Sequence, residues 1–355
     1  QAEDGIRDRS PSRGLGDVYK RQLQYSHSMG RGEFAGPGFR NPVAMARGAD
    51  DLMYVVNRSY EYRPDGKRIT ICTVDEEYIG EFARGVHTAG VTDIVTDDGS
   101  LIWPTSVALD KTGNVYVADE WLNRISIFTK DGEWIGKWGT EGNGNGEINK
   151  PSGMVFDTDD NMIMVDSQNN RIQKLTKNGE FISSFGTRGS GNGEFNLPWG
   201  IDLDADDNIY VADWRNDRIQ KFTKNGVFLM AIGTSGIEPG ELNRPTDVAV
   251  DSSGMIYVAD WGNERMQMFD PAGKFVTLTT GDGTMSKWGK DKLDGNTEMW
   301  ELREIAQGLE RERDFWGPVA VTVDEENRVF VVESCRNRIQ VFRRQEPMFR
   351  GGGRL

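Results

Sequence analysis

The stretch VYVADEWLNRISIF, residues 115–128, decides the fold because close copies of it follow four more times along the chain. The copies are MIMVDSQNNRIQKL (162–175), IYVADWRNDRIQKF (209–222), IYVADWGNERMQMF (256–269) and VFVVESCRNRIQVF (329–342). Self-similarity at a fixed period is the sequence signature of a repeat architecture. We therefore expect one structural unit, repeated, rather than a chain of unrelated domains.

Each copy carries an acidic residue followed five positions later by an arginine, and we call this series the Asp–Arg ladder. Its members are Asp119 and Arg124, Asp166 and Arg171, Asp213 and Arg218, Asp260 and Arg265, and Glu333 and Arg338. A catalytic site occurs once in a chain, whereas this pair returns in unit after unit. The ladder therefore indicates salt bridges and hydrogen bonds that fasten loops.

A proline that opens a short apolar run marks the beginning of each unit. These prolines are Pro42, Pro104, Pro151, Pro198, Pro245 and Pro318. The unit that starts at Pro198 contains four runs, WGIDLDA, NIYVAD, RIQKFTK and VFLMAIG, separated by Asp, Asn and Gly residues typical of tight hairpins. Each unit is thus predicted to be a four-stranded antiparallel sheet, and such sheets bury their faces by stacking side by side around an axis.

The patterns P-x-x-[VIM]-x-[VLF]-D, [VI]-[AV]-[DE]-x-x-x-x-R-[IM] and G-E-[FIL] resemble those of the NHL-repeat family of β-propellers, over roughly Leu23 to Arg344. The resemblance implies an all-β, six-bladed propeller of four-stranded antiparallel blades. The first unit departs from the pattern, because Asn57 takes the acidic position and Arg68 follows eleven residues later.

The two ends of the repeat region are expected to meet. The chain has no fourth strand after the one that follows Arg338, whereas LQYSHSMGRGEF (23–34) resembles the fourth-strand segments that end at Ile148 and Phe195. We therefore predict a single propeller over 23–345, with blades starting near 42, 104, 151, 198, 245 and 318, closed by strands from both termini. Closure removes the free sheet edges that promote aggregation.

Three segments fall outside the repeat. Residues 1–22 lack periodicity and are interpreted as a non-native or disordered leader, so the native N-terminus is expected to be missing and an extracytoplasmic location stays open. Residues 346–355 are expected to form a flexible tail. Residues 285–316 form a helical insertion in which Met299, Leu302, Ala306 and Leu309 have near-helical spacing after a cap at Asn296 or Thr297. This helix either crosses the channel mouth as a lid or fills a gap between blades.

All length variation falls on the face that carries the loops between second and third strands and the connections from one blade to the next, and we call this face the top. Repeat proteins usually place function on such a face. The candidate ligand-binding residues are Trp199, Asp202, Asp247, Thr246, Trp121, Trp214 and Trp261. The tryptophans either form a ligand platform or pack against a neighbouring loop.

Asp202 and Asp247 replace small or apolar residues of the aligned innermost strands. Two carboxylates near the axis require water, a cation or a ligand, so calcium is a candidate here, although no cofactor is expected. Asp202 and Asp247 are also the candidate metal ligands, and no residue is identified as catalytic.

Composition limits the function classes. The net charge of −14 disfavours nucleic acid, and no apolar run is long enough to span a membrane. A three-histidine zinc site of the peptide-amidating lyases is excluded, since the chain has only His27 and His87. Cys72 and Cys335 are expected to lie toward opposite faces without a disulfide.

The leading hypothesis is a non-catalytic binding or scaffold propeller that engages a protein, peptide or glycan through its top face. The alternative is a calcium-assisted hydrolase or lyase with its site in the upper central channel.

Overall fold

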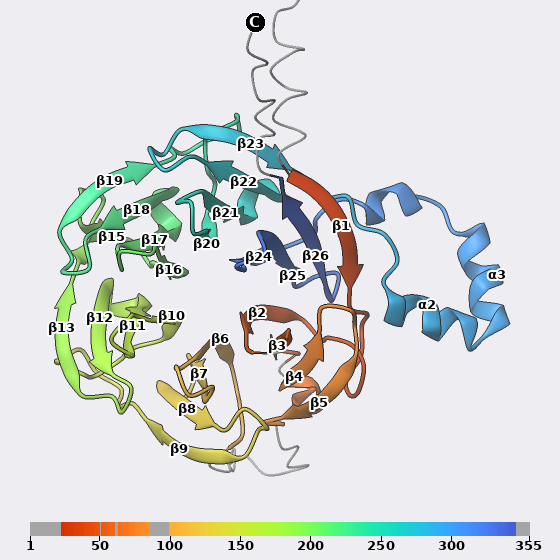
Figure 1. The fold of residues 1–355 in the computed structure, drawn as a ribbon, viewed down its shortest axis with the longest axis horizontal. Helices are drawn as coiled ribbons and strands as arrows, with labels where there is room; N and C mark the ends of the chain where they lie inside the picture. Colours follow the sequence, from red (N-terminus) through yellow and green to blue (C-terminus); the bar gives the residue numbers. More distant parts are fainter. Residues whose placement is uncertain (1–22, 50, 61–62, 85–98, 346–355) are drawn as a thin grey trace, which may run out of the picture.

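The computed structural model describes residues 23–49, 51–60, 63–84 and 99–345. The interpretations of residues 1–22, of residues 346–355 and of His87 lie outside the described residues. Six four-stranded antiparallel sheets surround a central axis, as predicted (Figure 1). No helix among the described residues is long and apolar enough to cross a membrane.

Blades 1 to 3 follow one another along the first half of the chain, each with its strands ordered from the axis outward. Blade 1 consists of β2 (Pro42–Arg47), β3 (Leu52–Asn57), β4 (Arg68–Thr73) and β5 (Tyr78–Phe82), with the 3-10 turn η1 (Pro64–Gly66). Blade 2 consists of β6 (Pro104–Leu109), β7 (Val115–Asp119), β8 (Arg124–Phe128) and β9 (Trp134–Trp138). Blade 3 consists of β10 (Pro151–Phe156), β11 (Asn161–Asp166), η2 (Ser167–Asn169), β12 (Arg171–Thr176) and β13 (Phe181–Phe185).

Blades 4 and 5 repeat the same order, and a short parallel pair, β14 (Thr187–Arg188) with β15 (Glu194–Phe195), precedes blade 4. Blade 4 consists of β16 (Ile201–Leu203), β17 (Ile209–Asp213), η3 (Trp214–Asn216), β18 (Arg218–Phe222) and β19 (Phe228–Ile232). Blade 5 consists of β20 (Pro245–Val250), β21 (Ile256–Asp260), η4 (Trp261–Asn263), β22 (Arg265–Phe269) and β23 (Phe275–Thr279). The inner strand β16 begins later than Pro198 because Trp199 and Gly200 contact Ala212 through irregular backbone hydrogen bonds.

Blade 6 is assembled from both ends of the repeat region. It contains β24 (Pro318–Val323), β25 (Arg328–Glu333) and β26 (Arg338–Arg344) from the C-terminal side, and β1 (Leu23–Met29) from the N-terminal side. The register of the antiparallel pair runs from Leu23 opposite Arg344 to Met29 opposite Ile339. This is the strand pairing expected from the sequence, and it joins the red and dark blue ribbons of Figure 1.

The hydrophobic core lies between blades rather than inside any one of them. Among the described residues the buried apolar side chains form six clusters, each shared by two adjacent blades, one cluster for every junction of the ring. Tyr54 and Val56, for example, pack with Val107 and Val117 across the junction of blades 1 and 2. A blade therefore buries both faces only when it has neighbours on both sides.

An apolar residue lies three positions before each unit-opening proline. Its side chain fills the top of the junction between two adjacent blades. These residues are Phe39, Leu101, Ile148, Phe195, Leu242 and Phe315, all at most 2% exposed. The sequence comparison that matched Phe34 to Ile148 and Phe195 was therefore wrong, because Phe39 makes the equivalent backbone bonds and Phe34 does not. Phe34 instead lies between the guanidinium groups of Arg40 and Arg63. The fixed spacing of three residues before the proline identifies the equivalent residue, whereas the G-E-[FIL] pattern does not.

The insertion after blade 5 forms two helices, α2 (Lys287–Asp294) and α3 (Thr297–Ile305), and the 3-10 turn η5 (Leu309–Glu312). Asn296 caps α3 as predicted, but the helix ends at Ile305 because Ala306 is extended and Gly308 adopts a positive φ of 75°. Figure 1 places both helices outside the ring, beside β1, so the insertion does not cover the channel.

Candidate functional site

The Asp–Arg ladder stabilises the top loops that carry Trp121, Trp214 and Trp261. In blade 4, Asp213 is fully buried. Its Oδ1 accepts a hydrogen bond from the backbone N–H of Asn196 at 2.8 Å, and its Oδ2 accepts from Arg218 Nε at 2.9 Å. Burial raises the pKa of Asp213, while these hydrogen bonds act to lower it. The carboxylate thus pins the connection from blade 3 to its own blade.

A glutamine two positions after the arginine completes this network and was missed in the sequence analysis. Gln220 Nε2 donates to the carbonyl of Glu194 at 2.7 Å and to Asp213 Oδ2 at 3.1 Å. Arg218 Nη2 also donates to the Glu194 carbonyl, at 3.0 Å. The pattern R-[IM]-Q was visible at residues 171–173, 218–220, 265–267 and 338–340. In blade 4 the aspartate, the arginine and the glutamine each hydrogen-bond to loop backbone, which agrees with a fastening role.

Blade 2 uses its anchor differently. The carboxylate of Asp119 accepts four backbone N–H groups, from residues 102, 103, 121 and 122, at 2.7 to 3.1 Å. Arg124 donates to the carbonyl of Ser100 at 2.6 Å. Asp119 therefore holds both the connection that enters blade 2 and the turn between β7 and β8.

Tryptophans gather on the top face, and Trp103 and Trp214 each lie beside an arginine. Trp121, 58% exposed, lies 6.2 Å from the ring of Trp103. The guanidinium of Arg58 lies 4.8 Å from the Trp103 centroid, and that of Arg244 lies 5.6 Å from Trp214. These contacts orient the rings while leaving part of each surface open to solvent.

The top loops of blades 5 and 6 enclose a cavity of about 390 Å³, which we call the blade 5–6 cleft. Its lining residues are Asn243, Arg244, Trp261, Gly262, Glu264, Trp316, Gly317 and Cys335. Trp316 is 53% exposed, and Arg336 lies 5.7 Å from its ring. Only Trp261 had been identified from the sequence; Trp316 and Arg244 lie outside the anchor motif and were missed.

A second cavity of about 410 Å³ shares Trp316 and Cys335 with the blade 5–6 cleft. Its other walls are formed by the loop after β1, around Arg31, and by Arg303 and Glu312 of the insertion. The insertion therefore extends the hollowed part of the top face sideways, outside the ring.

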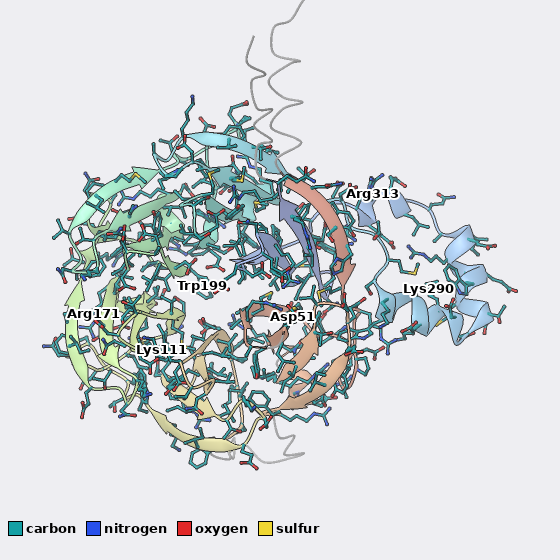
Figure 2. The ribbon with its side chains drawn as sticks, viewed as in Figure 1. Asp51, Lys111, Arg171, Trp199, Lys290 and Arg313 are labelled. Carbon is teal, nitrogen blue, oxygen red and sulfur yellow. The ribbon has the colours of Figure 1, made fainter. Side chains whose placement is uncertain are left out.

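Two of the predicted ligand residues have backbone or packing roles. The carbonyl of Trp199 accepts hydrogen bonds from Gly153 N at 2.8 Å and from Ser152 Oγ at 2.7 Å, which links blades 3 and 4. Its half-buried indole lies at the inner end of blade 4 (Figure 2). Thr246 is buried, and its Oγ1 donates to the carbonyl of Ala259 at 3.4 Å.

Asp202 and Asp247 line one cavity of about 270 Å³ in the central channel. Counted from the proline that opens each unit, the cavity is bounded by the third to sixth residues, so it lies deeper than the expected upper-channel position. Asp202 Oδ2 accepts from Val250 N at 2.8 Å, and Asp247 Oδ2 accepts from Val321 N at 3.1 Å. Each carboxyl therefore satisfies a channel-facing N–H on the inner strand of the next blade.

Burial in the channel wall shifts both carboxyl groups toward the neutral form. It raises the pKa of Asp202 to about 7 and that of Asp247 to about 8, and the negative charge of Asp202 adds to the shift of Asp247. The Cβ position of Gly200 would lie 2.1 Å from Asp247 Oδ1, so the glycine makes room for this carboxyl.

The described residues contain no group of three or more His, Cys, Asp or Glu side chains placed to hold a metal ion. His27 lies on β1, where its Nε2 is 3.2 Å from the carbonyl of Val74. Both cysteines are free thiols, as predicted, with Cys72 buried in the core between blades 6 and 1 and Cys335 exposed on the top face.

Comparison with known proteins agrees with this architecture. The NHL repeat matches residues 195–222, 242–269 and 315–342, and a family described as a 6-bladed beta-propeller matches residues 90–175. No curated protein matches the chain. The chain is a six-bladed propeller that contains NHL repeats.

Solved structures share the fold at low identity. Virginiamycin B lyase from Staphylococcus aureus is similar with a TM-score of 0.55 and 13% identity, over 90% of this chain and 99% of the lyase. A streptogramin B lyase gives 0.54 and 11%, over 91% and 97% of the two chains. A protein of unknown function from Bacteroides thetaiotaomicron gives 0.58 and 17%, over 90% and 76%.

Proposed function

We propose that this protein is a binding propeller that engages a protein, peptide or glycan through its top face without catalysing a reaction. The blade 5–6 cleft carries the proposal. Trp261 and Trp316 line the same cavity as Arg244, Glu264 and Asn243. Aromatic rings beside hydrogen-bonding groups of both signs suit an amphipathic ligand such as a peptide or a sugar chain.

The ladder supports this proposal by making the platform rigid. Both sides of the cleft rest on buried anchors, Asp260 for the loop that carries Trp261 and Glu333 for the segment that carries Trp316. The N–H of Trp316 donates directly to Glu333 Oε1 at 3.0 Å. A preorganised site loses little conformational entropy on binding.

Binding to peptide and glycan arrays tests the proposal. We expect the chain to retain a defined ligand class, and Trp261→Ala with Trp316→Ala to weaken that binding at least tenfold, which is about 1.4 kcal/mol. Trp134→Ala is the matched control, since Trp134 lies on the outer strand β9 and is 41% exposed. Equal loss in both variants, or no binding in either array, contradicts the proposal.

The alternative is a calcium-assisted hydrolase or lyase acting in the channel, and the shared cavity of Asp202 and Asp247 favours it. The same ring architecture hosts enzymes and binding proteins, so the fold does not choose between them. Against it, each carboxyl already accepts an inter-blade N–H, and calcium requires six to eight oxygen ligands. Calcium calorimetry on the wild type and on Asp202→Asn with Asp247→Asn tests this. Affinity no better than about millimolar in the wild type removes the alternative.

A further inference from the structure

The two helices of the insertion are attached to the ring very differently. Helix α2 is anchored by Trp288, which is 4% exposed and packs in the core shared by blades 6 and 1, with its ring 5.6 Å from that of Phe39. The carbonyl of Trp288 accepts from Arg31 Nη1 at 2.8 Å, and the Ser286 hydroxyl donates to the Gly30 carbonyl at 2.6 Å. Helix α3 has no buried residue.

The side chains of α3 that bond to the rest of the insertion, Trp300 and Arg303, lie on one face of the helix. Trp300 Nε1 donates to Asp294 Oδ1 at 3.1 Å, and Arg303 pairs with Glu312 at 2.6 Å. Met299 lies on the same side of the helix and is partly buried. These contacts fix the orientation of α3 and therefore determine which residues face outward.

The opposite face presents Glu298, Glu301, Leu302 and Ile305, at i, i+3, i+4 and i+7, which share one side of a helix. Leu302 is 59% exposed and Ile305 is 76% exposed. The two glutamates are exposed and form no ion pair among the described residues. We call these four residues the outer face of α3. It is an adjacent apolar pair flanked by carboxylates.

An isolated helix of nine residues is marginal in water, and such helices are normally stabilised by burying their apolar face. In α3, Leu302 and Ile305 are instead exposed. Exposed apolar side chains that adjoin one another and are rimmed by charge mark interaction sites, whereas single ones need no explanation.

We propose that the outer face of α3 binds a basic amphipathic segment of a partner protein. Its apolar side chains cover Leu302 and Ile305, and its lysines or arginines pair with Glu298 and Glu301. A second copy of this chain fits less well, because it would bring the same carboxylates and a net charge of −14. This surface is separate from the blade 5–6 cleft, so the proposal does not rest on that site.

A labelled synthetic helix of leucine and lysine is the probe, titrated against the full chain by fluorescence anisotropy. We expect Leu302→Ala with Ile305→Ala, and separately Glu298→Gln with Glu301→Gln, to weaken binding about tenfold each. Trp261→Ala with Trp316→Ala should bind the probe as the wild type does. A leucine–glutamate helix should not bind.

Matched variants separate the site from general attraction to an acidic protein. Glu133→Gln with Glu180→Gln removes two exposed charges from blades 2 and 3, and Ile182→Ala with Leu229→Ala removes two exposed apolar side chains from β13 and β19. Both should bind the probe unchanged. Equal loss in the control and test variants overturns the proposal. It is also overturned if the chain is a dimer without probe that Leu302→Ala with Ile305→Ala converts to a monomer.

Discussion

Blades 1 and 4 solve the same loop-closing problem with different charges. In blade 4, Asp213 accepts the Asn196 N–H at 2.8 Å and pairs with Arg218. In blade 1, Asn57 accepts the Arg40 N–H at 2.7 Å, and the buried Arg68, opposite Asn57 in the strand register, pairs with Glu81 at 2.9 Å. The repeated requirement is therefore an oxygen acceptor at the anchor and a carboxylate for the arginine. The two need not be the same residue.

Removing the arginine of blade 1 should have the largest effect. Arg68 is fully buried and, besides Glu81, donates to the carbonyl of Gly38 at 3.0 Å. Arg68→Ala leaves Glu81 without this partner and is expected to destabilise the fold by about 3 to 5 kcal/mol. Chemical denaturation measures the loss. Arg84→Ala is the control, because Arg84 pairs with the same Glu81 from an exposed position and should cost less than about 1 kcal/mol.

The two blades also differ at the channel, where β16 carries Asp202 at the position that Ala46 occupies in β2. The pKa values of Asp202 and Asp247, about 7 and 8, lie above the ordinary value of 3.8, so the folded state holds protons that the unfolded state releases. The free energy that these two bound protons contribute to folding is fully present below about pH 4. It is lost as pH rises through 7 to 8.

We expect the pH-dependent loss to be on the order of 2 to 4 kcal/mol, below the full linkage value because the cavity admits solvent. Denaturation midpoints of the wild type and of Asp202→Asn with Asp247→Asn, recorded from pH 5 to 9, give the difference curve. A difference that does not change with pH contradicts the assignment.

In blade 4, Arg218→Ala should cost about 1 to 3 kcal/mol, because Asp213 loses one of several hydrogen bonds rather than all of them. The cost should be smaller than that of Arg68→Ala in blade 1. Arg215→Ala, an exposed neighbour, is the control. An unchanged denaturation midpoint and slope for Arg218→Ala would show that the ladder is dispensable there.

The smallest expected effect is the coupling free energy between Asn57→Asp and Glu81→Gln in blade 1. Together these substitutions move the carboxylate back to the anchor position that it occupies in blade 4. Asn57→Asp alone places a second carboxylate near Arg68 and removes the donation to Thr70 Oγ1, while Glu81→Gln alone removes the present partner. Each should destabilise. Together they should cost about 1 kcal/mol less than their sum, measured as a double-mutant cycle. Simple additivity would mean that charge position is irrelevant.

The sequence predicted the features that depend on repetition. Six blades, the proline-led inner strands and the pairing of β1 with β26 all follow from residues that return at fixed spacing. Features that depend on one position were harder to predict. The apolar spacing toward Leu309 suggested a longer helix, although Gly308 already disfavours one.

The candidate site also contains residues that the sequence predicted and residues that it did not. Asp202 and Asp247 stood out because they break the repeat, and they do share a cavity. Their hydrogen bonds to Val250 and Val321 depend on how far neighbouring inner strands are staggered, which no local pattern encodes. Trp316 and Arg244 reach the blade 5–6 cleft from connections whose sequence does not repeat, so only the assembled ring brings them together.

The strand pair that closes the ring also imposes an order in time on the newly made chain. Gln24 contacts Gln345 across 321 residues of sequence. At a ribosome that adds roughly 5 to 20 residues per second, β1 waits roughly 15 to 60 s before its partner exists. During that interval the backbone edge of β1 and the apolar face of blade 1 that packs on blade 6 are open to other chains. The junction of blades 6 and 1 is thus the part of the nascent chain that stays open to misassembly until β26 has been synthesised.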